Sequence, residues 1–467
     1  MISIDYFQNK LEGINMVILH VLANGPPDVN GYAIRTQMIL KHQKSSLDVM
    51  GLTSPWYPQR DSMIEQSQID GITYQRTIHP LHRQDKIPLS QKIIRMQTRK
   101  EQKESSKEKV KPASNIFVKA IRAPGYFFRI GWKVIEEKIL IKYFMKRIIE
   151  VAKQENATLI HAHTPYRVGL PALRAARKLG LPFVYEMRGM WEETAVANGR
   201  WLRNGPAYRR FQAYETKVLR KADAVVCISE TLKQEAIGRG VEPTKISVVT
   251  NAVDKTIGVD TTESSLYQQS IDSLNRASTT TVIGYIGSLR EMEGVDQTAE
   301  AVANLNNNGQ DVRLFVLTGQ SGQQELRNYC AKLGLSDNAV ICGPVPHEEV
   351  AAFYDLIDIF VVSRPDSRVT RLVTPLKPFE AMAMGRAVIA SRLPALQEII
   401  NEGETGLLYD ADDVNSLTEK ITELIDDNEL LQRLGDNARE WVMSNRTWEV
   451  VVQNYQSAYD KARESIR

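Results

Sequence analysis

Short apolar segments alternate with helical segments along this chain, in two separate series. The apolar segments are rich in Val, Ile and Leu with few polar interruptions, which predicts strands that are buried on both faces. Helices between such strands predict parallel sheets covered on both sides. We therefore predict an α/β protein with two doubly wound domains. The segments predicted to contain strands are residues 14–27, 45–55, 157–165, 181–189, 223–229, 245–254, 281–288, 312–319, 338–345 and 359–364.

The length of 467 residues also favours two domains over a single core. A polar stretch rich in Ser and Thr, at about 256–278, separates the two series and predicts a linker. We place the first domain at 1–255, the second at 279–445, and an amphipathic helix at 446–467. A charged insertion at about 83–112 has the composition of a loosely packed segment.

Charge and cysteine content exclude several classes of protein. The formal net charge is +3, which is nearly neutral and gives no indication of nucleic acid as a partner. The three cysteines form no CxxC pair, and their odd number is typical of a reducing compartment. The apolar segment at 16–23 is interrupted by His20 and is much shorter than the roughly 20 residues of a membrane span. We expect a cytoplasmic protein without a transmembrane helix.

Residues 373–391, with the sequence VTPLKPFEAMAMGRAVIAS, predict a short helix with charged residues at its start. Pro378 is tolerated in a first helical turn, and Gly385 is suited to follow a last one. Lys377 would then lie where free N–H groups favour an anion, and the Glu380 carboxylate can accept hydrogen bonds from paired hydroxyls. A nucleotide diphosphate with its ribose has both groups. The alternative is that Glu380 caps the helix and Lys377 is solvated.

Several segments together resemble the GT-B glycosyltransferases of family 4, the retaining enzymes that use nucleotide sugars. The resemblance covers nearly the whole chain and implies two Rossmann-like domains facing each other across a cleft. It also implies that the C-terminal helix crosses back and packs on the N-terminal domain. Segments of the first half resemble a narrower bacterial group tied to exopolysaccharide synthesis and exosortase systems. The segments that carry the broad resemblance lie at 228–254, 285–296, 374–391 and 403–410.

The resemblance implies transfer of a sugar from a nucleotide diphosphate to an acceptor hydroxyl, with retention of configuration. The C-terminal domain would bind the donor and the N-terminal domain the acceptor, which we expect to be a lipid-linked saccharide of exopolysaccharide or cell-surface glycan synthesis. The implied displacement occurs on the front face, and the donor phosphate helps to accept the proton. No nucleophilic carboxylate, metal or other cofactor is then expected.

The donor-binding residues implied by the resemblance come from both domains. Glu380 would bind the ribose hydroxyls, and Lys377 with the N–H groups around Thr374 would face the diphosphate. Gly287 follows the first strand of the second series, where a glycine lets the backbone approach a phosphate closely. Gly31 would play the same part from the other side of the cleft.

The chain departs from the family pattern at positions near the sugar and the phosphates. Leu372 stands where relatives carry the first of two glutamates, and Ser288 and Glu293 stand where relatives carry Arg and Lys. The charge that develops on a leaving diphosphate has to be stabilised. Arg290 and Arg364 are therefore predicted to replace the missing cations, with plain surface arginines as the alternative.

Polar residues of the first series are candidates for catalysis. Arg188 stands where relatives often carry a His, and is predicted to contact the donor sugar or the leaving phosphate. Glu192 is predicted to orient acceptor hydroxyls. His163 ends a predicted strand at the carboxyl edge, where such sheets bind ligands; the alternative is that His161 and His163, on one strand face, are structural hydrogen-bond partners. An HxH pair also suits a metal, but no third ligand follows at a useful spacing, so no metal site is predicted.

Residues 111–147 combine many Lys and Arg with interleaved aromatic side chains. This pattern is typical of a helix that lies in a membrane interface. We therefore predict peripheral contact with an anionic membrane surface, at the inner face of the cell membrane where lipid-linked acceptors lie. The alternative is an ordinary domain helix with solvated charges.

Two other functions remain open at this point. A nucleotide-sugar epimerase on the same fold would convert its donor without any acceptor. A non-catalytic nucleotide-binding subunit would bind without turnover, and the missing glutamate and cations favour it. The base (uracil, guanine or adenine) is also left open.

Overall fold

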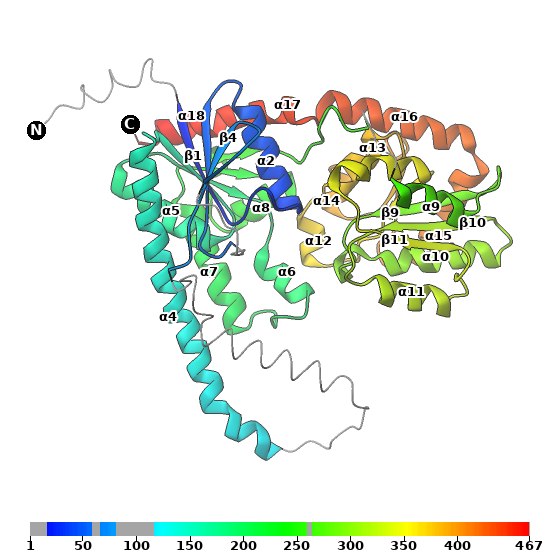
Figure 1. Cartoon of the computed structure of the whole chain (residues 1–467), viewed down its shortest axis with the longest axis horizontal. Coiled ribbons are helices and arrows are strands. Elements are labelled where there is room, and N and C mark those ends of the chain that lie inside the picture. Colours follow the sequence, from blue (N-terminus) through cyan, green and yellow to red (C-terminus); the bar gives the residue numbers. More distant parts are fainter. Residues whose placement is uncertain (1–15, 58–65, 81–115, 259–263, 467) are drawn as a thin grey trace, which may run out of the picture.

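The chain folds into two α/β domains, each built on one sheet (Figure 1). The computed structural model describes residues 16–57, 66–80, 116–258 and 264–466, with side chains from residue 133 onward in the long helix that begins at 116. The predicted charged insertion at 83–112 lies outside the described residues.

The first domain contains an eight-stranded sheet with the order β3-β4-β2-β1-β5-β6-β7-β8. Its neighbours are parallel except for β3 and β4, which form a hairpin around Asp70 and Gly71. Both turn residues have positive φ, as Asp-Gly hairpin turns require. The strands are β1 Val17–Leu22, β2 Asp48–Thr53, β3 Gln66–Ile69, β4 Ile72–Arg76, β5 Leu159–His163, β6 Phe183–Met187, β7 Ala224–Cys227 and β8 Ile246–Val248.

Helices cover both faces of this sheet. Apolar side chains of α4, α5, α7 and α8 form one buried cluster with the sheet. Apolar side chains of α2 and of the C-terminal helices form a second cluster with it. The helices of this domain are α2 Gly31–Gln43, α4 Ile116–Gln154, α5 Tyr166–Leu179, α6 Trp191–Ala197, α7 Pro206–Lys221 and α8 Glu230–Gly238.

The second domain contains a six-stranded parallel sheet with the order β11-β10-β9-β12-β13-β14. This domain begins after the segment in which the chain passes out of the first domain. Its core is a single large apolar cluster. The strands are β9 Thr281–Ile286, β10 Val312–Leu317, β11 Ala339–Cys342, β12 Ile359–Val362, β13 Ala387–Ser391 and β14 Leu407–Tyr409. The helices are α9 Ser265–Leu274, α10 Val295–Asn307, α11 Gln323–Lys332, α12 Arg368–Leu372, α13 Lys377–Ala383, α14 Pro394–Gln397, α15 Val414–Asp426 and α16 Asn428–Asn445.

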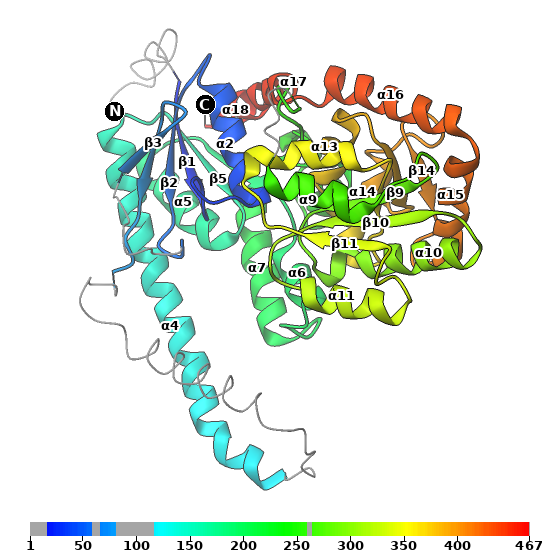
Figure 2. The same cartoon turned by 45° about the vertical axis from the view of Figure 1, so that its right-hand side comes forward.

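The end of the chain crosses back to the first domain, as Figures 1 and 2 show. Val253 on the outward crossing exchanges backbone hydrogen bonds with Arg446 and Trp448 on the return crossing, at 2.8 and 3.0 Å. Beyond this point α17 (Trp448–Val451) and α18 (Tyr455–Glu464) pack on the first domain, where α18 contacts β6, β7 and β8. The predicted fold class, two Rossmann-like α/β domains with a returning C-terminal helix, is confirmed.

Two local predictions were wrong. Residues 265–274, predicted as linker, form the helix α9 of the second domain. The Ser264 side chain caps this helix, and Leu274 is buried against the second core, so helical spacing of a few apolar residues outweighs the polar composition. The segment His347–Leu356, which lies between the predicted strands at 338–345 and 359–364 where an ordinary helix is expected, is a 3-10 helix.

Among the described residues, no helix is long and apolar enough to cross a membrane. The long helix α4 has the length, but charged side chains recur along it.

Candidate active site

The start of α2 in the first domain lies against the segment that precedes α13 in the second. A Cβ atom on Gly31 would lie 3.3 Å from Cδ1 of Leu376. Asn251, in the crossing between the domains, donates from Nδ2 to the carbonyl oxygen of Thr374 at 3.0 Å. Two of the predicted donor-binding residues, Gly31 and Thr374, thus lie at one interface although they come from different domains.

The helix α13 begins and ends where the sequence predicts. Pro378 lies in its first turn, and Gly385 follows its last turn with φ of 70°. Lys377 Nζ lies 2.7 Å from Glu380 Oε2, and the Tyr354 hydroxyl donates to the same oxygen at 3.0 Å. The Lys377 and Glu380 side chains are 28% and 17% exposed, so a ligand can reach both and exchange for their present partners.

Glu293, which stands where relatives carry a lysine, is neutralised by two arginines. Arg364 donates from Nε and Nη2 to Glu293 Oε2 at 3.0 and 2.9 Å, and from Nη1 to the Val373 carbonyl oxygen at 3.0 Å. Arg290 reaches the other carboxylate oxygen at 2.7 Å and keeps 48% of its side chain exposed. Arg364 is buried and fixed, whereas Arg290 is free to turn toward a phosphate.

The loops after β9 and β12 approach each other through glycines. Gly294 has φ of 65°, and a Cβ atom there would lie 1.8 Å from the Ser363 carbonyl oxygen. A Cβ atom on Gly287 would lie 2.6 Å from the hydroxyl oxygen of Tyr285. A larger residue at Gly294 would force these loops apart, and with them the Glu293–Arg364 contact, whereas one at Gly287 would press on the ring of Tyr285 in β9, the strand before it.

A fully buried carboxylate, Glu186, organises the carboxyl edge of the first sheet. Arg35 and Arg188 each donate from Nε to Glu186 Oε1 at 3.0 Å, and the Tyr455 hydroxyl donates to Oε2 at 3.0 Å. Burial raises the pKa of Glu186, but Arg188 and Arg35 together outweigh burial, so the pKa lies well below its ordinary value. The carboxylate therefore stays charged and holds the two arginines in place.

Three histidine rings lie beside this carboxylate. His161 and His163 stack with their centroids 4.4 Å apart, so both are on one strand face. His20 Nδ1 lies 3.0 Å from His163 Nε2, and His20 Nε2 lies 3.0 Å from Gln43 Oε1. Burial, Arg188 and His161 lower the pKa of His163 well below its ordinary value, so this ring is neutral at neutral pH.

The expectation that no third ligand accompanies the HxH pair was wrong. His20 lies on β1, beside β5, and one nitrogen from each of the three rings falls within 4.8 Å of the others. The surroundings nevertheless disfavour a cation. Arg188 donates to Nδ1 of His163, and both nitrogens of His20 already have protein partners. A metal ion would have to displace these hydrogen bonds beside a buried guanidinium.

Glu192 and its neighbour Glu193, in the first turn of α6, are buried and form ion pairs. Arg239 lies 2.6 Å from Glu192 Oε1. Arg368 of the second domain lies 3.0 Å from Glu193 Oε1. These contacts hold α6 against α8 and α12, and the predicted role of Glu192 in orienting an acceptor stays a prediction.

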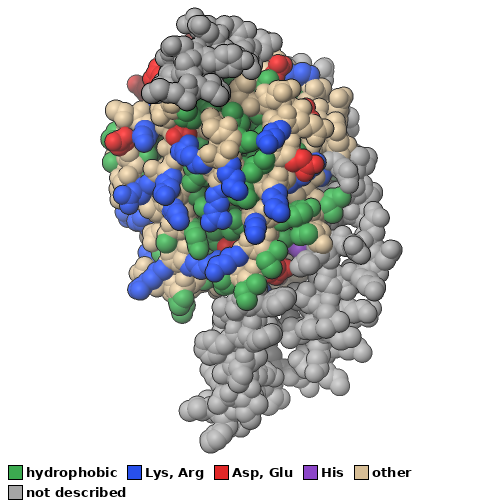
Figure 3. Space-filling view, turned by 90° about the vertical axis from the view of Figure 1, so that its left-hand side faces the viewer, with side chains coloured by type: hydrophobic (Ala, Val, Ile, Leu, Met, Phe, Trp, Pro, Cys, Tyr) green, Lys and Arg blue, Asp and Glu red, His purple; other side chains and the backbone are tan. Residues whose placement is uncertain are grey.

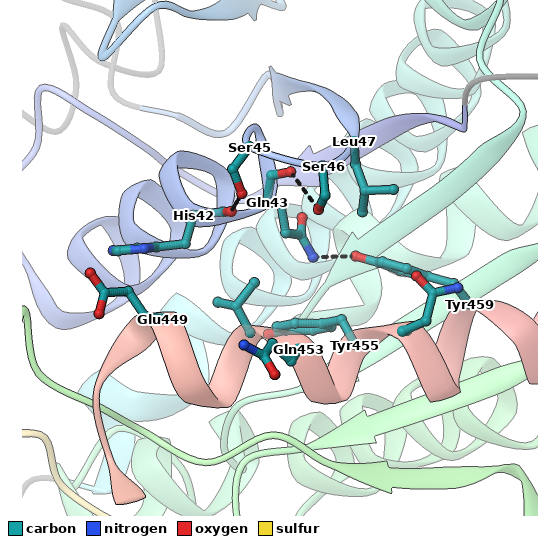
Figure 4. A pocket seen from close by; sticks show the side chains of 11 residues that line it. His42, Gln43, Ser45, Ser46, Leu47, Glu449, Gln453, Tyr455 and Tyr459 are labelled. Carbon is teal, nitrogen blue, oxygen red and sulfur yellow. Dashed lines mark hydrogen bonds between the residues drawn. The ribbon is translucent and has the colours of Figure 1, made fainter. Parts of the chain in front are cut away.

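A cavity of about 440 Å³ lies at the other end of α2 (Figure 4). The end of α2 and the helices α17 and α18 line it, and Gln43 donates to the Tyr459 hydroxyl at 2.7 Å beside it. The 13 residues of α2 span roughly 20 Å, which separates this cavity from Gly31. We assign the cavity no part in the interdomain site.

Comparison with known families matches both domains. Residues 111–256 match the family Glycosyltransferase Family 4, and residues 267–441 match the family Glycosyl transferases group 1. Together the two matches cover well over half of the chain. The chain belongs to the GT-B glycosyltransferases of group 1 and family 4.

This glycosyltransferase has similar proteins in several organisms. It is 27% identical to an uncharacterized glycosyltransferase of Methanocaldococcus jannaschii over 68% of this chain and 78% of that protein. Sucrose-phosphate synthase of Thermosynechococcus elongatus has a similar structure, with TM-score 0.67, 15% identity, and coverage of 96% and 100% of the two chains. HepE of Anabaena, solved in complex with UDP and glucose, has TM-score 0.65, 14% identity, and coverage of 95% and 98%.

The structure gathers the predicted residues of the glycosyltransferase into two groups, one at each sheet edge. The catalytic roles predicted for His163, Arg188 and Glu192 stay predictions, and the structure gives all three side chains buried, paired positions. The donor-binding roles of the second group also stay predictions. Several residues that hold these groups together carry no signal in the sequence that marks them as functional, namely His20, Arg35, Arg239, Asn251, Tyr354 and Tyr455.

Proposed function

We propose that this glycosyltransferase moves a sugar from a nucleotide diphosphate donor to an acceptor hydroxyl with retention of configuration. The observation that carries the proposal is the partly exposed Lys377–Glu380 pair at the start of α13, which follows Leu376, the residue that lies against Gly31 of the first domain. A cation for phosphate and an acceptor for ribose hydroxyls lie side by side there, which suits a nucleotide diphosphate.

In the proposed complex Glu380 accepts hydrogen bonds from the ribose hydroxyls. Lys377 and Arg290 face the diphosphate, since both keep part of their charge exposed. Arg364 binds Glu293 and the Val373 carbonyl oxygen, and in this way it positions the loop after β12. Solved structures of HepE with UDP and with UDP-glucose support a nucleotide-sugar donor for a protein of this fold.

The buried state of the first-domain carboxylates supports a front-face displacement. A double displacement needs a carboxylate nucleophile that can reach the anomeric carbon. Glu186 and Glu193 are buried and bound to arginines, so they are poorly placed for that attack. The leaving phosphate then takes the acceptor proton, and Lys377 and Arg290 stabilise its charge.

The acceptor in this proposal is a lipid-linked saccharide of bacterial exopolysaccharide or cell-surface glycan synthesis. Support comes from the resemblance of the first-half segments to that bacterial group. We further propose that the enzyme works at the cytoplasmic face of the membrane without a metal ion or cofactor. Turnover measured with and without EDTA tests whether the enzyme works without a metal ion. A loss of activity that Mg²⁺ or Mn²⁺ restores would contradict this part of the proposal.

Calorimetric titration of UDP, GDP and ADP into the purified protein tests the donor site. We expect one diphosphate to bind selectively, and Glu380→Ala to weaken it by about 1–3 kcal/mol. Glu404→Ala, an exposed glutamate of the same domain, is the matched control. Equal binding by both variants would remove Glu380 from the site.

Product analysis separates the proposed reaction from its alternatives. Incubation with the matching nucleotide sugar alone yields an epimerised donor only if the protein is an epimerase. Nucleotide binding without turnover, with any of several lipid-linked acceptors, would favour the non-catalytic subunit, for which the missing family cations at Ser288 and Glu293 argue.

A further inference from the structure

We propose that the outer face of the helices α4, α5 and α7 docks the protein on an anionic lipid bilayer. These helices cover the same face of the first sheet, and their apolar sides form one buried cluster with it. Their opposite sides face outward. Figure 3 shows the side of the molecule on which Lys and Arg side chains outnumber Asp and Glu and lie among hydrophobic ones.

Exposed positive charge dominates this face, which we call the basic face. In the described part of the three helices, Glu150 is the one largely exposed acidic residue, and it pairs with Arg147, while Glu136 is partly exposed. Glu137 and Glu215 are buried. The exposed cations that have no acidic partner among the described residues are Lys133, Lys138, Lys142, Lys146, Lys153, Arg174, Lys178, Arg209, Lys217, Arg220 and Lys221.

The second domain does not share this excess. On its outer helices α15 and α16, acidic side chains outnumber basic ones. The net charge of the chain is therefore small, +3, although its charges are unevenly distributed. The positive surface lies on the first domain, which is the acceptor domain in the proposed function. Each Lys or Arg near an anionic bilayer adds to the attraction, so several together make binding stable.

Exposed apolar side chains on α4 distinguish a bilayer from other polyanions. Ile135, Ile139 and Tyr143 are 50%, 56% and 36% exposed, and their spacing of four residues places them along one stripe of the helix. Lys138 and Lys142 lie next to this stripe. A bilayer offers an apolar phase beneath its anionic headgroups, whereas a nucleic acid backbone gives isoleucine no such partner.

A shallow hollow on α7 adds a place for a headgroup. Its volume is about 420 Å³, and Thr216, Lys217, Arg220 and Lys221 are among its lining residues. Lysine and arginine side chains around a hydroxyl suit the phosphate of a lipid headgroup. The long helix α4 extends beyond the body of the domain (Figure 1).

Vesicle flotation tests the proposal without any need for turnover, so its result is independent of the proposed reaction. We expect the full chain to float with vesicles of phosphatidylcholine and phosphatidylglycerol. With vesicles of phosphatidylcholine alone, we expect it to remain at the bottom of the gradient. Lys138→Glu with Lys142→Glu should weaken binding by at least about tenfold. The matched control is Lys332→Glu with Arg433→Glu, which makes the same charge change at exposed sites of the second domain. Thermal unfolding of both variants verifies that they fold.

A third variant, Ile135→Ser with Ile139→Ser, should weaken flotation most strongly at raised salt, where the charges are screened. Equal binding to neutral and anionic vesicles would overturn the proposal, and so would an equal loss in the α4 variant and its control. Binding of a short RNA that depends on Lys138 and Lys142, together with no flotation, would assign the basic face to nucleic acid instead.

Discussion

The carboxyl edges of the two sheets are built in different ways. At the first sheet, Glu186 and Arg188 are buried, and each is bound to several partners. At the second sheet, Lys377, Glu380 and Arg290 keep a sixth to a half of their side chains exposed. The first edge is a fixed scaffold that needs its charges for stability, and the second holds charges that a ligand can recruit.

The largest expected effect falls on stability at the first edge. Glu186→Gln would leave the buried guanidiniums of Arg35 and Arg188 without their carboxylate, and breaking a buried ion pair costs about 3–5 kcal/mol. We expect a corresponding fall in the free energy of unfolding, measured by urea denaturation. The exposed Glu404→Gln should change it by no more than about 0.5 kcal/mol. Equal small changes in both would show that the first edge is not a stabilising scaffold.

A second carboxyl of the first domain sharpens the comparison because, among the described residues, no cation forms an ion pair with it. Glu215 is buried and accepts from the Tyr166 N–H at 2.7 Å and from the Tyr185 hydroxyl, and burial raises its pKa to about 7. Since the folded pKa lies above the unfolded value, the folded state binds more protons between the two values, and stability falls as pH rises toward 7. The loss is on the order of 3 kcal/mol. Glu215→Gln should remove this loss.

Urea midpoints at pH 5 and pH 8 measure the effect of Glu215. We expect the wild type to lose more stability than Glu215→Gln between these two values. A parallel change in both proteins would show that Glu215 is ionised in the folded state across this range, as Glu186 is.

At the second edge, the expected effect falls on turnover rather than folding. Lys377→Ala removes a cation that faces the leaving diphosphate in the proposed complex, and should lower kcat on the order of a hundredfold. Nucleoside binding should change little, because Glu380 keeps its hydrogen bond from Tyr354. Steady-state kinetics and calorimetry with the nucleoside separate the two effects. A large loss of urea stability instead would make this pair structural, like the first edge.

The same contrast explains what the sequence was able to predict. The helix α13 follows from local signals, since Pro378 and Gly385 mark its ends and place Lys377 and Glu380. The doubly wound fold follows likewise from the repeated alternation of apolar strands and helices. The partners of Glu186 cannot be predicted in this way, because Arg35 and Tyr455 lie 151 and 269 residues away from it in the chain. Such contacts leave no periodicity or spacing, so the sequence indicated that edge only through the strand end at His163 and the family resemblance.

The smallest expected effect belongs to the residue that joins the two edges. Asn251 accepts from Arg35 Nη1 at 3.0 Å and donates to the Thr374 carbonyl oxygen at 3.0 Å. Asn251→Ala should lower kcat/KM only a few-fold, since the neutral hydrogen bond to Thr374, the one of its two bonds that reaches the donor segment, contributes about 1 kcal/mol. Asn308→Ala, at an exposed site, should leave kcat/KM unchanged.

Asn251→Asp decides which of the two contacts matters. The aspartate keeps an acceptor for Arg35 but has no N–H for Thr374. If it resembles Asn251→Ala in kcat/KM while the urea stability of the protein is preserved, the contact with Thr374 aligns the donor segment with the first domain. If Asn251→Asp behaves like wild type, the scaffold at Arg35 is sufficient, and the two edges work without a hydrogen-bonded connection through this residue.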